Sequence, residues 1–480
     1  MMNATHGEAG IALWRARLAG VPDCAKLVFS VVNPSTGLVV AHVSSCGRQE
    51  AMLAVEGASY AYSAWSRTDG TYRSHLLDKW RRLISDNIDH LATTVTSETG
   101  KPIREARTEI VDALEVIGQC ADVAKLSDFS TVVSHSRSQQ VHSRARPIGT
   151  VVAVTNWCQP ALTVARKTAL ALASGCPVIL KPSSRAPLTG IILAELWTEA
   201  GGPMGTFQVV PTDDPITVVD TFLSDTRVDM VTFTGSADVG QYLARQCAEA
   251  CKPFVQEING QRPFIVFADA DLERATEAII ACTFLRNAGQ DCTSASRLYV
   301  QDAIAERLLG ILTKKVAALR CGDPLAPDTQ MGPLVDGMML TVMAEQIADA
   351  LEGDAQLVIG GRRKDGLQFA PTILDRVRPE MRVATEELSG PILPVLRFSE
   401  TEEVLELAMS TTKGANAWLW TSDFVKAERV ARDLGYSNVW INDVGRGSKN
   451  QIMPWAGRMP VWPPAELAPY VKAVQFTVML

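Results

Sequence analysis

Apolar residues in the first quarter of the chain recur every three to four positions, which is the period of an amphipathic helix. This pattern predicts helices over Gln49–Trp65, Arg73–Thr96 and Ile103–Ala124. A Ser-rich stretch follows, Ser127–Arg144, in which polar and apolar residues alternate. Alternation with a period of two is typical of strands, so we expect a projecting hairpin there.

From Gly149 onward, short apolar runs alternate with helical segments. Strands are expected at Val151–Thr155, Pro177–Leu180, Gln208–Val210 and Met230–Thr234, with helices at Pro160–Ser174, Leu188–Ala200 and Ile216–Ser224. A second series follows Gly260, with strands at Phe264–Phe267 and Leu298–Val300 and helices from Leu272 and over Ile304–Leu319. Strands that alternate with helices form βαβ units, which predicts an α/β protein with parallel sheets.

Composition narrows the class of protein. A chain of 480 residues is too long for one core, so two or three domains are expected. The net charge of −7 argues against nucleic acid or an anionic membrane as a partner, and no apolar run is long enough to span a bilayer. The first 20 residues lack the basic start and apolar block of a secretory signal.

The ten cysteines are scattered and form no CxxC pair, which fits a reducing, cytoplasmic setting. Cys247 and Cys251 lie four residues apart in a helical segment and could form one face of a metal site. The interpretation as small core residues is favoured because no histidine follows His142 to complete such a site. We therefore expect no metal.

One thiol and one carboxylate carry the main candidate chemistry. Cys292 ends the run Asn287–Cys292, NAGQDC, and Glu257 lies in the upstream run Gln256–Gly260, QEING. A thiolate can attack a carbonyl, and a carboxylate can activate the water that removes the resulting acyl group. Taken alone, a cysteine in such a run is more often a buried thiol than a nucleophile.

Three weaker motifs suit a nucleotide ligand. The strand Met230–Thr234 leads into Gly235 and Ser236 at a helix start, where free backbone N–H groups favour phosphate, but such turns are common. Lys181 follows a buried strand, where ligands bind in open α/β sheets, although a solvated surface lysine is the commoner case. Glu387 lies in an acidic turn and could hold a ribose or simply end a helix.

In their joint order these motifs resemble the aldehyde dehydrogenase superfamily over residues 30–445. Further matching segments are Asn33–Gly37, Glu98–Pro102, Pro147–Gly149, Gly322–Pro324, Pro371–Leu374 and Asn442. Residues 264–271, 286–290 and 298–302 look most like succinate-semialdehyde dehydrogenases. The resemblance implies a cofactor-binding domain (residues 1–126 and 148–257), a catalytic domain (258–445) and a small β oligomerisation element (127–147 and 446–480). In that element the hairpin would pair with a C-terminal strand, Val474–Val478, and exposed strand edges favour a homodimer or homotetramer.

By the same resemblance, Cys292 forms a thiohemiacetal with a small-molecule aldehyde, and the thioester left after hydride loss is hydrolysed with the help of Glu257. The cofactor is NADP or NAD. Its matching positions are Trp157, Lys181, Ser184, Gly235, Ser236 and Glu387. Ser184 stands where NAD-preferring members often carry a glutamate that would repel a 2′-phosphate, which favours NADP.

Two arginines match positions that bind the remote carboxylate of a semialdehyde. Arg166 and Arg286 hold these positions, and a guanidinium can bind a carboxylate bidentately. The alternative is that either arginine forms a structural ion pair. An acidic semialdehyde is the substrate class that this pair predicts.

The chain also departs from the family. Cys158 stands where an asparagine amide normally binds the oxyanion, and losing one such donor costs roughly 10²–10³ in kcat. Asn156 or Gln159 could supply the missing amide, but neighbours in an extended segment point to different sides. The segment Pro454–Met459 matches only in part, and Ser294 replaces a redox-sensitive cysteine of some relatives. These departures keep open two alternatives: an impaired aldehyde-dehydrogenase fold with a binding or assembly role, and a thioester hydrolase.

Overall fold

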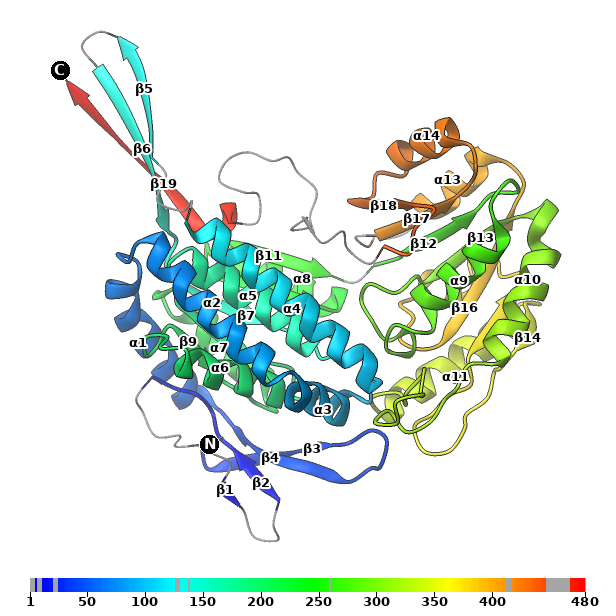
Figure 1. Cartoon of the computed structure of the whole chain (residues 1–480), viewed down its shortest axis with the longest axis horizontal. Helices are drawn as coiled ribbons and strands as arrows, with labels where there is room; N and C mark the ends of the chain where they lie inside the picture. Colours follow the sequence, from blue (N-terminus) through cyan, green and yellow to red (C-terminus); the bar gives the residue numbers. More distant parts are fainter. Residues whose placement is uncertain are drawn as a thin grey trace.

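The computed structural model describes residues 5–6, 11–19, 25–125, 130–136, 139–258, 260–410, 414, 416–445 and 467–479. Two α/β lobes lie side by side, and a thin β ribbon projects from the first of them (Figure 1). No helix within these ranges is both long enough and apolar enough to cross a membrane.

The first lobe is built on a five-stranded parallel sheet in the order β11-β10-β7-β8-β9. The strands are β7 (Thr150–Val154), β8 (Val178–Lys181), β9 (Phe207–Val209), β10 (Val228–Gly235) and β11 (Phe254–Ile258). Every residue of β7 and β8 is buried, as expected for central parallel strands that helices cover on both faces. The predicted parallel sheet is confirmed.

The described residues of this lobe form the helices α1 (Arg48–Trp65), α2 (Gly70–Asp86), α3 (Ile88–Thr99), α4 (Ile103–Ala124), α5 (Pro160–Ala173), α6 (Leu188–Glu199), α7 (Pro215–Ser224) and α8 (Ala237–Glu249). Trp80 packs edge-to-face on Trp197 at 5.7 Å between ring centroids, inside a hydrophobic cluster that joins α2–α6 to β7 and β8. The single helix predicted over Arg73–Thr96 is wrong. Asn87 ends α2, and its side chain donates to the carbonyl of Leu83 at 2.8 Å.

The second lobe holds a seven-stranded sheet in the order β14-β15-β16-β13-β12-β17-β18. Its strands are β12 (Pro263–Val266), β13 (Arg297–Gln301), β14 (Gln356–Ile359), β15 (Thr372–Asp375), β16 (Ile392–Phe398), β17 (Asn416–Trp420) and β18 (Asn438–Ile441). All its strand pairs are parallel except β14 with β15. Its helices are α9 (Leu272–Thr283), α10 (Asp302–Ala317), α11 (Gly337–Glu352), α12 (Arg382–Thr385), α13 (Thr401–Met409) and α14 (Phe424–Leu434).

Two smaller sheets complete the fold. The projecting ribbon is antiparallel and consists of β5 (Ser130–Ser136), β6 (Gln139–Pro147) and β19 (Val471–Met479), with Val474 opposite Arg144 (Figure 1). The predicted hairpin and its pairing with the C-terminal strand are therefore confirmed. A four-stranded sheet near the N-terminus was not predicted; it contains β1 (Thr5–His6), β2 (Ala12–Trp14), β3 (Leu27–Val32) and β4 (Val39–Ser45).

Candidate active site

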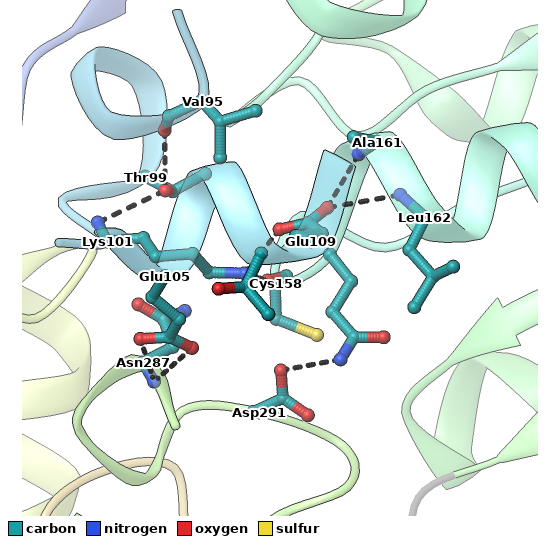
Figure 2. Close-up of polar contacts among 12 residues, drawn as sticks. Val95, Thr99, Lys101, Glu105, Glu109, Cys158, Ala161, Leu162, Asn287 and Asp291 are labelled. Atoms are coloured by element: carbon teal, nitrogen blue, oxygen red, sulfur yellow. Dashed lines mark hydrogen bonds and ion pairs between the residues drawn. The ribbon is translucent and has the colours of Figure 1, made fainter. Parts of the chain in front are cut away.

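Cys292 lies on a constrained loop between η1 (Asn287–Gly289) and β13. Asn287 and Ala288 have φ angles of 46° and 52°, a left-handed conformation that costs a non-glycine residue roughly 1–2 kcal/mol. The Glu105 side chain, on α4 of the first lobe, offsets this strain by accepting the Asn287 N–H at 2.8 and 2.9 Å (Figure 2). The nucleophile loop is thus held from the opposite lobe.

A second segment, residues 156–160, faces this loop at the start of α5. Lys101 donates to the carbonyl oxygen of Cys158 at 2.7 Å and to Glu109 at 2.5 Å (Figure 2). The other oxygen of Glu109 accepts the backbone N–H groups of Ala161 at 2.7 Å and Leu162 at 3.1 Å. This buried ion pair fixes the backbone on both sides of Gln159.

The two segments are also joined directly. Gln159 donates its side-chain amide to the carboxylate of Asp291 at 2.8 Å, and Asp291 accepts the Thr293 N–H at 2.7 Å. The side-chain amide of Gln159 is therefore bound to Asp291, the residue before Cys292, and does not face the Cys292 sulfur.

Cys158, Cys292 and Asn156 form a compact polar cluster. Cys158 and Cys292 are 5% and 6% exposed, and Cys158 is the neighbour with the largest effect on the pKa of Cys292. The Asn156 Nδ2 atom lies 3.1 Å from the Cys158 sulfur and 3.9 Å from the Cys292 sulfur. Asn156 thus reaches the nucleophile in a segment that has left strand β7 and bends at residues 157–159. The sequence argument that set Asn156 aside was wrong on this point.

The resting form of Cys292 is the neutral thiol. The hydrogen bond with Cys158 raises the pKa of Cys292 well above its usual value, and burial and the nearby Asp291 charge raise it further. The nearby Arg262 cation has the opposite effect and lowers the pKa of Cys292. A thiol that hydrogen-bonds in its neutral form resists ionisation, so the thiolate is the minor species at neutral pH.

Glu257 lies at the edge strand β11 and is held by cations. Its carboxylate lies 3.3 Å from the Lys167 ammonium and 3.8 Å from the Arg166 guanidinium, and it accepts from the Thr234 hydroxyl at 2.5 Å. Burial opposes ionisation, but these charges and hydrogen bonds outweigh it and lower the pKa of Glu257. The carboxylate is therefore ionised at neutral pH. Within the described residues, no hydrogen bond or ion pair joins it to Cys292.

All the candidate cofactor residues except Glu387 follow or end strands of the first sheet, at its carboxyl edge. Lys181 ends β8 and is buried, and its ammonium has no hydrogen bond or ion pair with any described residue. Burial lowers the pKa of Lys181 to about 8. Trp157 and Ser184 are half-buried, and the Arg185 guanidinium lies 5.9 Å from the Trp157 ring centroid. An isolated buried ammonium is costly unless a ligand carries the opposing charge.

The predicted phosphate turn has the expected form. Ser236 is the exposed N-cap of α8, and its hydroxyl makes no capping hydrogen bond. Gly235 precedes it, and a Cβ there would approach the Phe233 ring to 2.5 Å, so a side chain at this position would require the ring to move. Glu387 is exposed and follows α12 in the second lobe.

The two arginines assigned to the substrate contact the protein in this structure. Arg166 lies beside Glu257, as described above. Arg286 donates to the carbonyl oxygens of Thr293 at 2.9 Å and Val444 at 2.8 Å, and its guanidinium carbon lies 5.6 Å from the Trp418 ring centroid. Arg286 thus contacts Thr293, the residue that follows Cys292 on the nucleophile loop.

Sequence reasoning missed two buried charged residues, Arg262 near the thiols and Lys167 beside Glu257. Arg262 is buried, and burial lowers its pKa while the charges of Cys292 and Glu387 oppose that effect. It donates to the carbonyl oxygens of Ser294 and, at 2.8 Å, of Gly260. Lys167, the partner of Glu257, is also buried. The signal available in the sequence was the presence of charged residues next to apolar strands and inside an apolar helix.

Cys247 is buried and Cys251 is exposed, so the core interpretation holds only for Cys247. Among the described residues, no cluster of three histidine, cysteine or acidic side chains could hold a metal ion. The altered segment Pro454–Met459 lies outside the described residues.

Comparison with known proteins identifies the family. Residues 21–459 match the aldehyde dehydrogenase family model. The 3-sulfolactaldehyde dehydrogenase of Pseudomonas putida is 38% identical over 431 residues, which cover 89% of this chain and 88% of that protein. The NADP-dependent succinate-semialdehyde dehydrogenase of Escherichia coli K12 is 38% identical over 429 residues, with the same coverage of each chain.

The fold agrees with these sequence matches. The crystal structure of succinate-semialdehyde dehydrogenase from Burkholderia pseudomallei superposes with a TM-score of 0.92 at 33% identity, over 97% of this chain and 98% of that one. The resemblance inferred from the ordered motifs and the predicted α/β fold are both confirmed. The family model, the sequence relatives and the shared fold together show that the chain belongs to the aldehyde dehydrogenase family.

Proposed function

We propose that the protein oxidises an aldehyde with a remote anionic group to the carboxylic acid, with NADP or NAD as the oxidant. The observation that carries the proposal is the placement of Cys292, a buried thiol on a strained loop that Glu105 braces from the opposite lobe. An amide N–H lies 3.9 Å from its sulfur. These are the surroundings that covalent attack on a carbonyl requires.

Cys292 first loses its proton to solvent, and its thiolate attacks the aldehyde carbon. The new C–S bond forms as the carbonyl electrons move onto oxygen, which gives a thiohemiacetal anion. The bound nicotinamide supplies the hydride acceptor for the oxidation of this adduct to a thioester. Water then attacks the thioester, Glu257 takes the proton, and the Cys292 thiolate leaves as the carboxylic acid is released.

The contacts of Glu257 determine how it can act as the base in hydrolysis. Its low pKa keeps it ionised, so it can accept a proton at neutral pH. Its oxygens are occupied by Lys167, Arg166 and Thr234. We infer that the side chain leaves this ion pair when it serves as the base.

The residues present fit a phosphate-bearing cofactor. Lys181 is buried and has no hydrogen-bond or ion-pair partner among the described residues, and the turn at Gly235 and Ser236 opens the N-terminus of α8. Lys181 and Ser184 would hold the adenosine ribose, Ser236 the pyrophosphate, Trp157 one wall of the cleft, and Glu387 the nicotinamide ribose. Arg185 is paired with Asp336 at 2.5 Å, which leaves Lys181 and Ser184 as donors for a 2′-phosphate and favours NADP.

The substrate class follows from the relatives and from Arg286. The printed names of the relatives include succinate semialdehyde, glutarate semialdehyde and 3-sulfolactaldehyde, all small aldehydes that carry an anionic group. Arg286 contacts the residue after Cys292, and Arg166 lies beside Glu257. We assign both to recognition of the remote anion.

We also assign a separate role to each region of the chain. Residues 1–126 and 148–257 would bind the cofactor, residues 258–445 would carry the catalysis, and residues 127–147 and 446–480 would mediate assembly into a homodimer or homotetramer. The edges of the projecting ribbon favour such pairing. The scattered free cysteines fit a cytoplasmic setting.

A steady-state assay tests the proposed function. Purified protein is mixed with NADP or NAD and with succinate semialdehyde or butanal, and the absorbance of the reduced nicotinamide is followed. We expect turnover with succinate semialdehyde, a much higher KM for neutral butanal, and no turnover for Cys292→Ala. Arg286→Met should remove the preference for the anionic aldehyde. Failure of every aldehyde to reduce either cofactor would refute the proposal.

A further inference from the structure

We propose that the side-chain amide of Asn156 donates the hydrogen bond that stabilises the oxyanion, in place of the amide that is lost at Cys158. This inference rests on the proposed function, because an oxyanion forms only if Cys292 attacks a carbonyl. Asn156 would then be a catalytic residue.

The distances place the donor beside the reacting atoms. Asn156 Nδ2 lies 3.9 Å from the Cys292 sulfur, and the oxyanion is two bonds away from that sulfur in the adduct. A useful donor lies about 2.7–3.1 Å from the position that the oxyanion takes. A donor 3.9 Å from the sulfur can reach an oxygen that lies beside the sulfur on the donor's side.

The bonding state of Asn156 supports a functional placement. One of its N–H groups meets the sulfur of Cys158 at 3.1 Å, and sulfur is a weak acceptor that an oxyanion would outcompete. Its Oδ1 atom is buried and has no hydrogen-bond partner among the described residues. A buried orphan acceptor costs about 1–3 kcal/mol, so a purely structural amide would be expected to satisfy both ends.

The neighbouring candidates are excluded by their own contacts. Gln159 gives its amide to Asp291, and Cys158 offers only a weak S–H donor that already interacts with Cys292. The Lys101–Glu109 pair meanwhile holds the Cys158 carbonyl and the start of α5, so the backbone that carries Asn156 is fixed. A fixed donor costs no reorganisation when charge develops.

Asn156 assists the attack of Cys292 on the carbonyl carbon. The Cys292 thiolate forms the C–S bond, and the carbonyl π electrons become a lone pair on oxygen, whose negative charge the Asn156 N–H meets. When hydride leaves the carbon, that electron pair re-forms the C=O bond of the thioester. The amide remains neutral throughout and gives up no proton.

The test compares four variants with succinate semialdehyde and NADP. Asn156→Ala should lower kcat by roughly 10²–10³. Asn156→Asp should lower it further, because a carboxylate repels the oxyanion. Asn156→Ala combined with Cys158→Asn should recover at least about tenfold of the loss, because the amide returns at its family position. Asn87 is a half-buried asparagine at a helix end, so Asn87→Ala is the control and should leave kcat unchanged.

A second readout separates catalysis from folding. Alkylation of Cys292 by iodoacetamide creates no oxyanion, so Asn156→Ala should slow it by less than about tenfold while kcat collapses. A kcat for Asn156→Ala within about threefold of the native value would overturn the proposal, as would an equal loss of kcat and alkylation. Absence of turnover in the native protein would instead refute the proposed function.

Discussion

Replacement of Lys101 by methionine should destabilise the protein by about 3–5 kcal/mol, because it leaves the buried carboxylate of Glu109 unpaired. The two side chains are 1% and 4% exposed, and their charged atoms are 2.5 Å apart. Methionine keeps the length and apolar bulk of lysine, so the charge and its hydrogen bonds are the main loss. One of those bonds goes to the Cys158 carbonyl, so kcat should fall as well.

The assay is urea unfolding of the native protein, Lys101→Met, Glu109→Gln and the double variant, followed by tryptophan fluorescence. The double variant should lose less than the sum of the single losses, with a coupling of about 0.5–3 kcal/mol for residues in direct contact. Lys125→Met is the matched control. Lys125 pairs with Asp122 at 3.0 Å but is 50% exposed, and such pairs contribute about 0–1 kcal/mol. A loss for Lys101→Met as small as that of the control would refute the reasoning.

Three further predictions concern charge in the site. Because the pKa of Cys292 is raised, its alkylation rate should increase about tenfold per pH unit from pH 7 to 9, and Cys158→Ala should shift this profile to lower pH. Arg262→Gln removes the opposing cation and should slow alkylation at pH 7; an unchanged rate would contradict the role of Arg262. Lys181 loses its charge as pH rises through about 8, so the KM for NADP should increase between pH 7 and 9, whereas Lys181→Met should show a high, flat KM.

Much of the fold could be predicted because short apolar strands alternate with amphipathic helices along the sequence, which is the pattern of βαβ units. The buried strands β7 and β8 are continuous apolar runs, and the ribbon of β5, β6 and β19 shows period-two alternation. The break between α2 and α3 was missed because the apolar periodicity continues across Asn87, where one polar cap ends the first helix. Strand β11 and strands β14 to β18 were not predicted either, and the last five lie in residues 356–441, where the sequence analysis assigned no elements.

The site was predictable in its residue types and less so in its contacts. The ordered motifs indicated that Cys292 and Cys158 would share a site, and the structure brings them together. An ion pair of Arg166 was an open alternative, but its partner could not be foreseen, because Arg166 and Glu257 lie on elements far apart in the sequence. Arg262 also looked like an ordinary charged residue before a strand, and only its burial shows that it lies near the thiols.

The most direct test of the account is to trap the acyl group on Cys292. Glu257→Gln protein is mixed with succinate semialdehyde and NADP, quenched in acid, and examined by intact-protein and peptide mass spectrometry. Without the base that activates water, the thioester should accumulate, and one succinyl group should map to Cys292. A burst of reduced cofactor with no acyl group on Cys292, or with the acyl group on Cys158, would contradict the account.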